Sequence, residues 1–297
     1  MVTLLFPMAL SACTHSQSPQ IANELHFSLD GISDVTVSYD EEPITFFKAE
    51  GDELIIKEYM TENKSSYYAS VTQKNDRIHV SEGRKPLFKD GFYRYVEVYL
   101  PASYQEALTI TTTDGDIDLS RLELQLSGLY IDSTAGTVEI NSAHASDIHL
   151  SSTSGTLELG KIEADTIQLQ TTRGNVLCDE LTGCVTYTST SGNADIKAAT
   201  GSGSYKANNS GNLNVAYAEV TGDLYFFNKN DAINLTIPAD LDFEFEATTK
   251  NGSVTTTFQE YLTIDGRTIR GIVGGDATIT ITTETNNGNI EVAYGEN

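Results

Sequence analysis

Three acidic side chains recur at one position of a repeating pattern. Asp118, Glu139 and Glu158 each lie three residues after a glycine and between two apolar residues. Two carboxylates facing one cleft are what glycoside hydrolysis requires, and Ca²⁺ prefers several carboxylate oxygens. If the strands that carry them stack about 4.8 Å apart, these residues form an outward acidic ladder. A solvated charged face is the alternative interpretation, because the chain has no Trp and no dense aromatic group stands beside these residues in the sequence.

Other catalytic and metal-binding patterns are incomplete. A structural zinc site needs about four ligands, and no Cys/His cluster supplies them. Ser-Gly pairs recur, but none lies in the Gly-x-Ser-x-Gly pattern of a nucleophile elbow. The sequence therefore predicts no metal site, no cofactor and no catalytic residues, and we expect that the protein is not an enzyme.

Two cysteines lie within one repeat. Cys178 falls four residues after Gly174, at a position expected to point inward, and Cys184 follows six residues later. An exported protein can form disulfides, so a bridge between the two is one interpretation. Two small, half-buried apolar side chains are the other, and the sequence leaves both open.

The third cysteine, Cys13, ends an apolar N-terminal segment. "MVTLLFPMALSAC" is too short to span a bilayer and is typical of a signal peptide. Its end, "LSAC", resembles a bacterial lipobox, in which the cysteine thiol accepts a diacylglyceryl group. No Lys or Arg precedes the apolar run, which departs from that pattern, and an ordinary cysteine after an apolar start is the alternative. We interpret residues 1–12 as a signal peptide and residues 13–21 as the lipidated Cys13 and a polar tether, which predicts an extracytoplasmic protein anchored in the cell membrane.

The charge balance limits the partners. The 297 residues include 18 Lys and Arg against 42 Asp and Glu, which gives a net charge of −24. Such a chain repels phosphate backbones, so nucleic acid is excluded as a partner. The remaining partners are the membrane through the N-terminal lipid, a surface glycan or protein, and further copies of the chain.

The elements that position these residues follow a period. Glycines at equivalent positions are separated by 21, 19, 19, 18 and 19 residues, and Asp231 then stands where the next glycine is expected. Gly252 follows Asp231 after 21 residues, and Gly288 comes 36 residues later. We call these positions the anchors: Gly115, Gly136, Gly155, Gly174, Gly192, Gly211, Asp231, Gly252 and Gly288.

Apolar residues alternate on both sides of each anchor. They occupy the second and fourth positions after it, as in Leu157 and Leu159, and the seventh and fifth before it, as in Ile148 and Leu150. A period of two indicates strands with one buried face. Before Gly211 the pattern slips by one residue, so we expect Tyr205 and Ala207 to take the inward positions through a bulge.

A unit of about 19 residues cannot bury its own apolar face, whereas stacked units can. The sequence therefore predicts an all-β, single-stranded β-solenoid, with a β-sandwich as the alternative. Each unit is expected to be a strand, a glycine turn that needs a positive φ, a second strand and a second turn. Residues 96–297 are predicted to form the solenoid repeats. Residues 22–95 alternate without the anchors and are predicted to form an irregular, β-rich N-terminal cap.

Several phrases resemble a bacterial family of putative adhesins, β-solenoid domains of unknown function. The similarity covers roughly residues 30–295 and is strongest in "VEVYLPASYQEALTITTTDGDIDL", "INLTIPADLDFEFEATTKNGSV" and "RGIVGGDATITITTETNNGNIEV". Pro101 and Pro238 match the family's turn, and Gly274-Gly275 precede the last unit as in that family. The resemblance implies a solenoid in extracytoplasmic or membrane-associated proteins.

Together these observations predict a cell-surface, lipid-anchored β-solenoid that acts as a binding or scaffold module and is adhesive. The alternative function is a carbohydrate-active enzyme, a polysaccharide lyase or hydrolase built on a β-helix. A cleft with convergent acids and a sugar platform would favour the enzyme.

Overall fold

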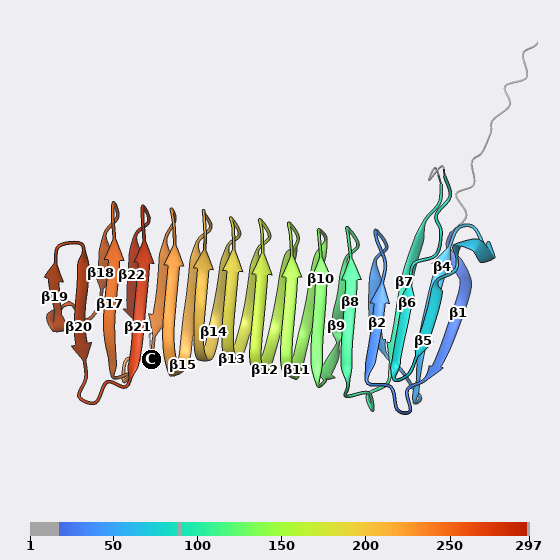
Figure 1. Cartoon of the computed structure of the whole chain (residues 1–297), viewed down its shortest axis with the longest axis horizontal. Coiled ribbons are helices and arrows are strands. Elements are labelled where there is room, and N and C mark those ends of the chain that lie inside the picture. Colours follow the sequence, from blue (N-terminus) through green and yellow to red (C-terminus); the bar gives the residue numbers. More distant parts are fainter. Residues whose placement is uncertain (1–17, 88–90, 296–297) are drawn as a thin grey trace, which may run out of the picture.

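The computed structural model describes residues 18–87 and 91–295, which form an elongated rod of stacked strands (Figure 1). The described residues contain 22 β-strands and two short 3₁₀ helices, η1 (Ser65–Tyr67) and η2 (Gln259–Tyr261). The prediction of an all-β solenoid is confirmed. The predicted signal peptide and Cys13 lie outside the described residues. No helix in the described part of the chain is long and apolar enough to cross a membrane.

The middle of the rod consists of parallel coils in register. Thr137 pairs with Thr156, Val176 with Ala194 and Leu213 with Ile233, which are steps of 19, 18 and 20 residues. These steps confirm coils of about 19 residues. The strands are β8 (Ala107–Thr112), β9 (Ile117–Gln125), β10 (Gly128–Ser133), β11 (Thr137–Ser152), β12 (Thr156–Thr171), β13 (Val176–Ser189), β14 (Ala194–Ala207), β15 (Leu213–Asn228) and β16 (Ile233–Ile237).

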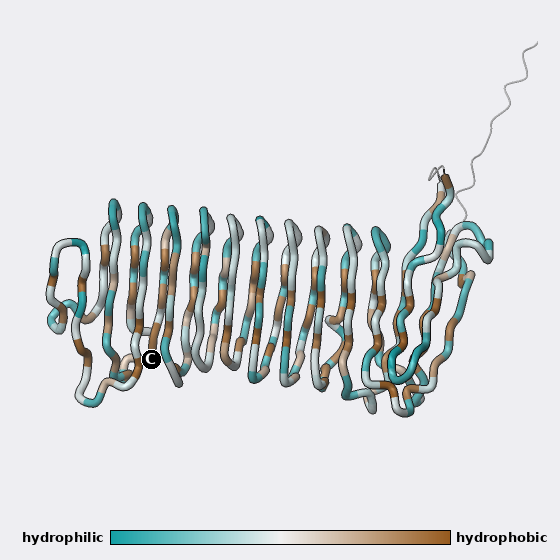
Figure 2. Tube along the Cα trace, in the orientation of Figure 1, coloured by the Kyte–Doolittle hydropathy of each residue, from teal (hydrophilic) through white to brown (hydrophobic). Residues whose placement is uncertain are grey.

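The apolar columns expected on both sides of the anchors are buried, and Figure 2 shows apolar and polar residues alternating along each coil. A third inward column replaces the second turn of the predicted unit. Strands β11 to β15 each run without interruption from one anchor turn nearly to the next, because apolar residues about seven positions after each anchor also pack inward. This column contains Leu124, Ala143, Ile162, Leu181 and Ala199, which pair in register.

The one-residue slip before Gly211 has the expected outcome. Tyr205 and Ala207 are fully buried, and Tyr205 pairs with Tyr187 on one side and Phe226 on the other. The extra residue lies in the anchor turn rather than in a strand bulge. Residues 208–212 separate Ala207 from Leu213, whereas residues 190–193 make the equivalent connection in the preceding coil.

The anchors need glycine mainly because neighbouring backbones approach closely. A Cβ placed on Gly155 would lie 1.8 Å from the carbonyl oxygen of Gly136, and Gly174 would meet Gly155 at 2.1 Å. Only Gly136 and Gly211 among the anchors have a positive φ, so the expectation of a left-handed turn at every anchor was wrong. The repeated glycine therefore reflects stacking of one coil on the next more than the conformation of a single turn.

At the N-terminal end, coils enter the stack out of chain order. Strand β2 lies between β6 and β8, and β3 lies between β7 and β9, all in parallel pairs. Beyond β7 the sheet continues through antiparallel β4 and β1, and β5 pairs antiparallel with β6. The bounds are β1 (Gln20–Ser28), β2 (Asp34–Ser38), β3 (Ile44–Lys48), β4 (Glu53–Met60), β5 (Ser70–Lys74), β6 (Arg77–Ser81) and β7 (Arg94–Leu100).

The C-terminal end repeats this arrangement. Chain order would stack the coil of Gly252 on that of Asp231, but the coil of Gly288 lies between them: β21 pairs with β15 and β17, and β22 with β16 and β18 (Figure 1). Strand β20 pairs antiparallel with β17 at this end, and β19 pairs antiparallel with β20. The bounds are β17 (Phe243–Thr249), β18 (Val254–Thr256), β19 (Leu262–Asp265), β20 (Thr268–Val273), β21 (Ile279–Thr285) and β22 (Ile290–Tyr294).

Phenylalanines fill the core where the stack ends. Phe258 is fully buried, and its ring contacts those of Phe243 and Phe245 edge-on at centroid distances of 5.2 Å. Large aromatic side chains bury the most apolar area per residue, so they suit the last coil, which has no further coil to cover it. The side chains of this coil therefore fill the apolar core at the C-terminal end of the stack.

Candidate functional site

The three acids of the predicted ladder lie on adjacent strands in register. Glu139 pairs with Asp118 on one side and with Glu158 on the other. Glu139 and Glu158 are exposed, while the Asp118 carboxylate accepts hydrogen bonds from the backbone N–H of Ser120 at 2.9 Å and from its hydroxyl at 2.6 Å. The column continues through Leu177 and Asp195, beside a shallow cavity of about 420 Å³.

The ladder offers no assembled metal site. Among residues 18–87 and 91–295, no group of three or more His, Cys, Asp or Glu side chains is arranged to hold a metal ion. The side chains of a parallel ladder point the same way and stand one strand spacing apart, whereas Ca²⁺ needs six or more oxygens around one point. The ladder can attract cations to this face without enclosing one.

The two described cysteines are free in this structure. Cys178 is buried in its inward position, and its thiol donates to the Glu180 carbonyl oxygen at 3.4 Å. Burial raises the pKa of the Cys178 thiol to about 12, so the thiol is protonated at neutral pH. Cys184 is exposed, and the structure does not contain the bridge between them that the sequence left open.

An aromatic stack, which the sequence analysis missed, extends the face that carries the ladder. Thr45 pairs with both Asp118 and Glu97, so the column of the ladder runs into the N-terminal strands. Two residues further along the same strands, on the same face, the Phe47 and Tyr99 rings stack with centroids 5.2 Å apart. No aromatic group is close to the ladder residues along the chain, but the folded rod places these two rings beside the ladder.

The faces of these rings are already engaged. The Arg121 guanidinium lies 4.7 Å from the Phe47 centroid, and the Lys57 ammonium lies 4.9 Å from that of Tyr99. Strands β9, β3, β7 and β4 are neighbours in that order, so each cation approaches the stack from its outer side. The stack fits cation–π stabilisation of the sheet better than a platform for a sugar ring.

A buried ionic cluster is the second feature that the sequence did not reveal. The Arg94 side chain is fully buried and donates from Nη2 to Glu42 Oε1 at 3.0 Å and to the Glu82 carboxylate. The Lys85 Nζ lies 2.9 Å from Glu82 Oε1 and 3.2 Å from Glu42 Oε1. The Tyr39 hydroxyl donates to the fully buried Glu58 at 3.1 Å. Burial of charges at this density requires such pairing.

The ionisation of the cluster follows from its burial. Burial raises the pKa of Glu82, because a carboxylate is stabilised less in a low-dielectric interior than in water. Burial lowers the pKa of Lys85, but its contacts with Glu82 and Glu42 outweigh that effect, and the pKa is raised overall. Lys85 is therefore a cation at neutral pH. We call the charged surface formed by Glu42, Glu82, Lys85 and Arg94 the floor.

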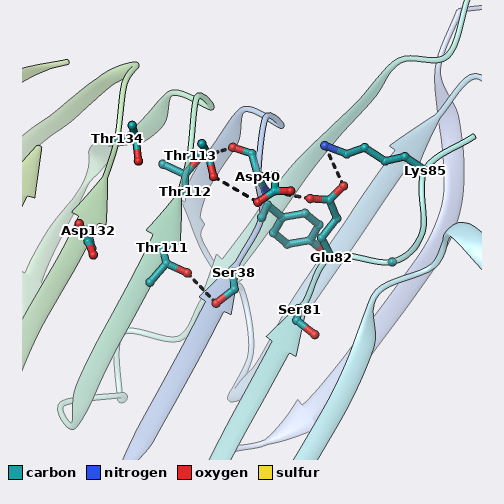
Figure 3. A pocket seen from close by; sticks show the side chains of 12 residues that line it. Ser38, Asp40, Ser81, Glu82, Lys85, Thr111, Thr112, Thr113, Asp132 and Thr134 are labelled. Atoms are coloured by element: carbon teal, nitrogen blue, oxygen red, sulfur yellow. Dashed lines mark hydrogen bonds and ion pairs between the residues drawn. The ribbon is translucent and has the colours of Figure 1, made fainter. Parts of the chain in front are cut away.

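A polar cleft of about 510 Å³ lies against this floor (Figure 3). Its walls come from the ends of four parallel strands that are adjacent in the stack, β6, β2, β8 and β10. They contribute Ser81, Glu82, Lys85, Ser38, Asp40, Thr111, Thr113, Asp132 and Thr134. Such strands end at one edge of the rod, so residues between 38 and 134 meet there. The 21-residue period places the β8 and β10 residues side by side, but neither motif nor period marks the β2 and β6 side of the cleft.

The comparisons with known proteins place the chain in a family. The family model of the Toastrack domain, DUF4097, matches residues 32–293. The chain belongs to the Toastrack DUF4097 family. The match includes the out-of-order coils at both ends of the rod as well as the regular middle, so the Toastrack domain covers the cleft, the ionic cluster and the ladder. The predicted membership of a family of unknown function is confirmed.

Solved structures similar to this Toastrack domain include three described as putative adhesins. That from Bacteroides fragilis is 10% identical, covers 91% of this chain and 96% of its own, and has a TM-score of 0.43. That from Parabacteroides distasonis is 10% identical with the same coverage and a TM-score of 0.41. That from Parabacteroides merdae is 13% identical, covers 91% and 95%, and has a TM-score of 0.39. Comparison with curated proteins finds no match.

Proposed function

We propose that this Toastrack protein is a lipid-anchored binding module of the bacterial cell surface, and that it holds a rigid rod away from the membrane to contact a partner. The observation that carries the proposal is the polar cleft across four strands. Its walls are fixed by hydrogen bonds and buried ion pairs, which reduces the ordering that binding would otherwise require. The external partner is a surface glycan or protein, and further copies of the chain are additional partners.

The anchor part of the proposal is supported by the sequence of the N-terminus. The "LSAC" segment ends at Cys13, and the polar residues 14–17 lie between that cysteine and the first described residue. A single acyl chain binds membranes only weakly, so the diacylglyceryl group of a lipoprotein is what would hold the rod in place. We expect Cys13→Ser to abolish labelling by a radioactive fatty acid and to move the protein out of the membrane fraction. Unchanged labelling would reject Cys13 as the acceptor.

The binding part is tested with the soluble Cys13→Ser protein. Screening it against an array of glycans and against intact cells measures whether it binds a surface ligand. Saturable binding to a defined glycan or cell type is the expected result. Binding that shows no saturation on any surface would contradict a binding module.

One observation favours the alternative of a carbohydrate-active enzyme. Adjacent rungs about 4.8 Å apart bring Glu139 and Glu158 close to the roughly 5–5.5 Å that separates the carboxyl groups of retaining glycosidases. The assay incubates the protein with uronate and neutral polysaccharides and follows new reducing ends or unsaturated products. Turnover that disappears in a Glu139→Gln, Glu158→Gln variant would establish the enzyme and overturn the binding module, whereas we expect no turnover.

A further inference from the structure

We propose that the polar cleft binds a protonated amino sugar, such as the glucosamine unit of a glycan that has lost its N-acetyl groups. The inference rests on the proposed binding function and names the ligand of that site. It combines two requirements that the cleft imposes on any occupant, a positive charge and several hydroxyl groups, and each requirement follows from different residues.

The requirement for positive charge comes from two aspartates. Glu82 and Lys85 line the cleft, but Glu82 is paired with Lys85 and Arg94, and Lys85 also pairs with Glu42 and Glu41, so the charges of both residues are already engaged. Asp40 and Asp132 are both exposed. No described cation pairs with the carboxylate of either, and the Asp132 carboxylate has no hydrogen-bond partner among the described residues. The cleft therefore presents two uncompensated carboxylates, which favour a cationic ligand.

The backbone of Asp40 is fixed by hydrogen bonds, although its carboxylate has no cationic partner. Its backbone N–H donates to Glu82 Oε2 at 2.8 Å, and its backbone carbonyl accepts the N–H groups of Thr113 and Asp114, both at 2.8 Å. Its carboxylate accepts one hydrogen bond, from the Thr113 hydroxyl at 3.2 Å. The ionic cluster thus orients an acceptor without neutralising it, which is the arrangement expected of a binding group.

The requirement for hydroxyl groups comes from the side chains between the aspartates. Ser81, Ser38, Thr111 and Asp132 are paired in succession across β6, β2, β8 and β10, which gives one polar group at each spacing of about 4.8 Å. The Thr111 hydroxyl donates to Ser38 Oγ at 2.7 Å, which leaves the Ser38 proton available to a ligand. Figure 3 shows Thr113 and Thr134 at the rim of the same cleft.

A hydroxyl-lined cleft with two free carboxylates matches a ligand that carries an ammonium group and several hydroxyls on one ring. A neutral sugar would leave both carboxylates unpaired, and a bare amine would leave the hydroxyls unpaired. A bound ligand displaces water from these polar groups, and a group that loses water without gaining a new partner weakens binding, so both are expected to bind less tightly.

The experiment is a calorimetric titration of the soluble Cys13→Ser protein at physiological ionic strength. The probes are a glucosamine tetramer, its N-acetylated counterpart and tetralysine. We expect saturable binding of the glucosamine tetramer at one site per chain, with both other probes bound at least tenfold more weakly. N-acetylated tetramer or tetralysine bound as tightly as the glucosamine tetramer would overturn the amino sugar as the ligand.

A matched pair of variants separates the cleft from the general attraction of a chain with a net charge of −24. Asp40→Asn with Asp132→Asn removes two charges from the cleft, and Glu139→Gln with Glu158→Gln removes two from the ladder. We expect the cleft pair to weaken binding of the glucosamine tetramer at least tenfold and the ladder pair to change it less than twofold. An equal effect of both pairs would show non-specific attraction and overturn the assignment of the cleft.

Circular dichroism and the melting temperature of each variant show whether its fold is intact. Because Asp40 takes part in a turn, Asp132→Asn alone serves as a second variant, at a carboxylate that makes no hydrogen bond or ion pair with the described residues. Unchanged binding in a folded Asp132→Asn variant would likewise contradict the proposal. The glycan and cell screen distinguishes this inference from the proposed function. If the cleft variants still bind the surface ligands found in that screen, the binding module stands and only the amino-sugar site is contradicted.

Discussion

Replacement of Gly155 by alanine tests the stacking of the anchors most directly. The new Cβ would lie 1.8 Å from the Gly136 carbonyl oxygen, where an ordinary carbon–oxygen contact is about 3.3 Å. The two coils would therefore have to separate locally by about 1.5 Å. That movement strains the bond between the coils from the Ser154 N–H to the Thr134 carbonyl at 2.8 Å. The new Cβ would also lie 3.0 Å from Ser152 Oγ, which weakens the bond that this oxygen accepts from the Gly155 N–H.

The expected loss of stability follows from these contacts. Forcing an extra carbon into a packed site costs about 1–3 kcal/mol, and each weakened hydrogen bond adds about 1 kcal/mol. Alanine also lowers the conformational entropy of the unfolded chain, which offsets about 0.4–1 kcal/mol of this loss. Gly155→Ala should therefore lower the free energy of unfolding by about 2–4 kcal/mol.

Gly51→Ala is the matched control, because a Cβ on Gly51 meets no atom within 4 Å and its φ is not positive. We expect a change of less than about 1 kcal/mol there. The assay is urea unfolding followed by circular dichroism, with hydrogen exchange of the amides in β11 and β12 to locate the damage. Equal stability of the two variants would refute close backbone approach as the reason for the glycine anchors.

Three further predictions concern packing, thiols and the ionic cluster. Leu157→Asp should cost several kcal/mol because Leu157 is fully buried, whereas Glu158→Lys, one residue on and exposed, should cost under about 1 kcal/mol; similar melting temperatures would defeat the register. At pH 8 an alkylating reagent should modify Cys184 in the folded chain and Cys178 only after denaturation, because the raised pKa keeps the buried thiol protonated; mass spectrometry that finds both modified at once would contradict this. Arg94→Met should destabilise the fold by about 3–5 kcal/mol in thermal unfolding, because it leaves two glutamates without their buried partner, and an unchanged melting temperature would show that the pairing is not needed.

The acidic ladder could be placed from the sequence because its geometry is local. A period of two sets which side of a strand Glu139 faces, and a period of about 19 sets its neighbours in the stack. Both periods are visible along the chain, so the register of Asp118, Glu139 and Glu158 follows from counting. The third apolar column was visible in the same way, since apolar residues such as Ile162 and Leu181 recur seven positions after the anchors.

The cleft could not be placed by counting. Thr113 and Asp132 come from the coils of β8 and β10, which follow the regular step, but Asp40 and Lys85 join them only because β2 enters the stack between β6 and β8. The aromatic stack has the same origin, since Phe47 lies beside Tyr99 through the pairing of β3 with β7. No period connects the segments of β2, β3, β6 and β7 with the regular coils, and their residues have no motif in common.

The sequence by itself thus determined the coil, its inward and outward faces and the column of anchors. It did not determine the order in which coils stack at the two ends. A step of 21 residues permits the coil of Gly252 to lie directly on that of Asp231, yet the coil of Gly288 lies between them. The backbone pairing is equivalent in both orders, because any coil offers its neighbour the same ladder of hydrogen bonds. The core must be filled where the stack ends, however, and of these two coils the one that carries Phe243, Phe245 and Phe258 has the larger side chains. The order therefore depends on packing that exists only once the whole rod is assembled.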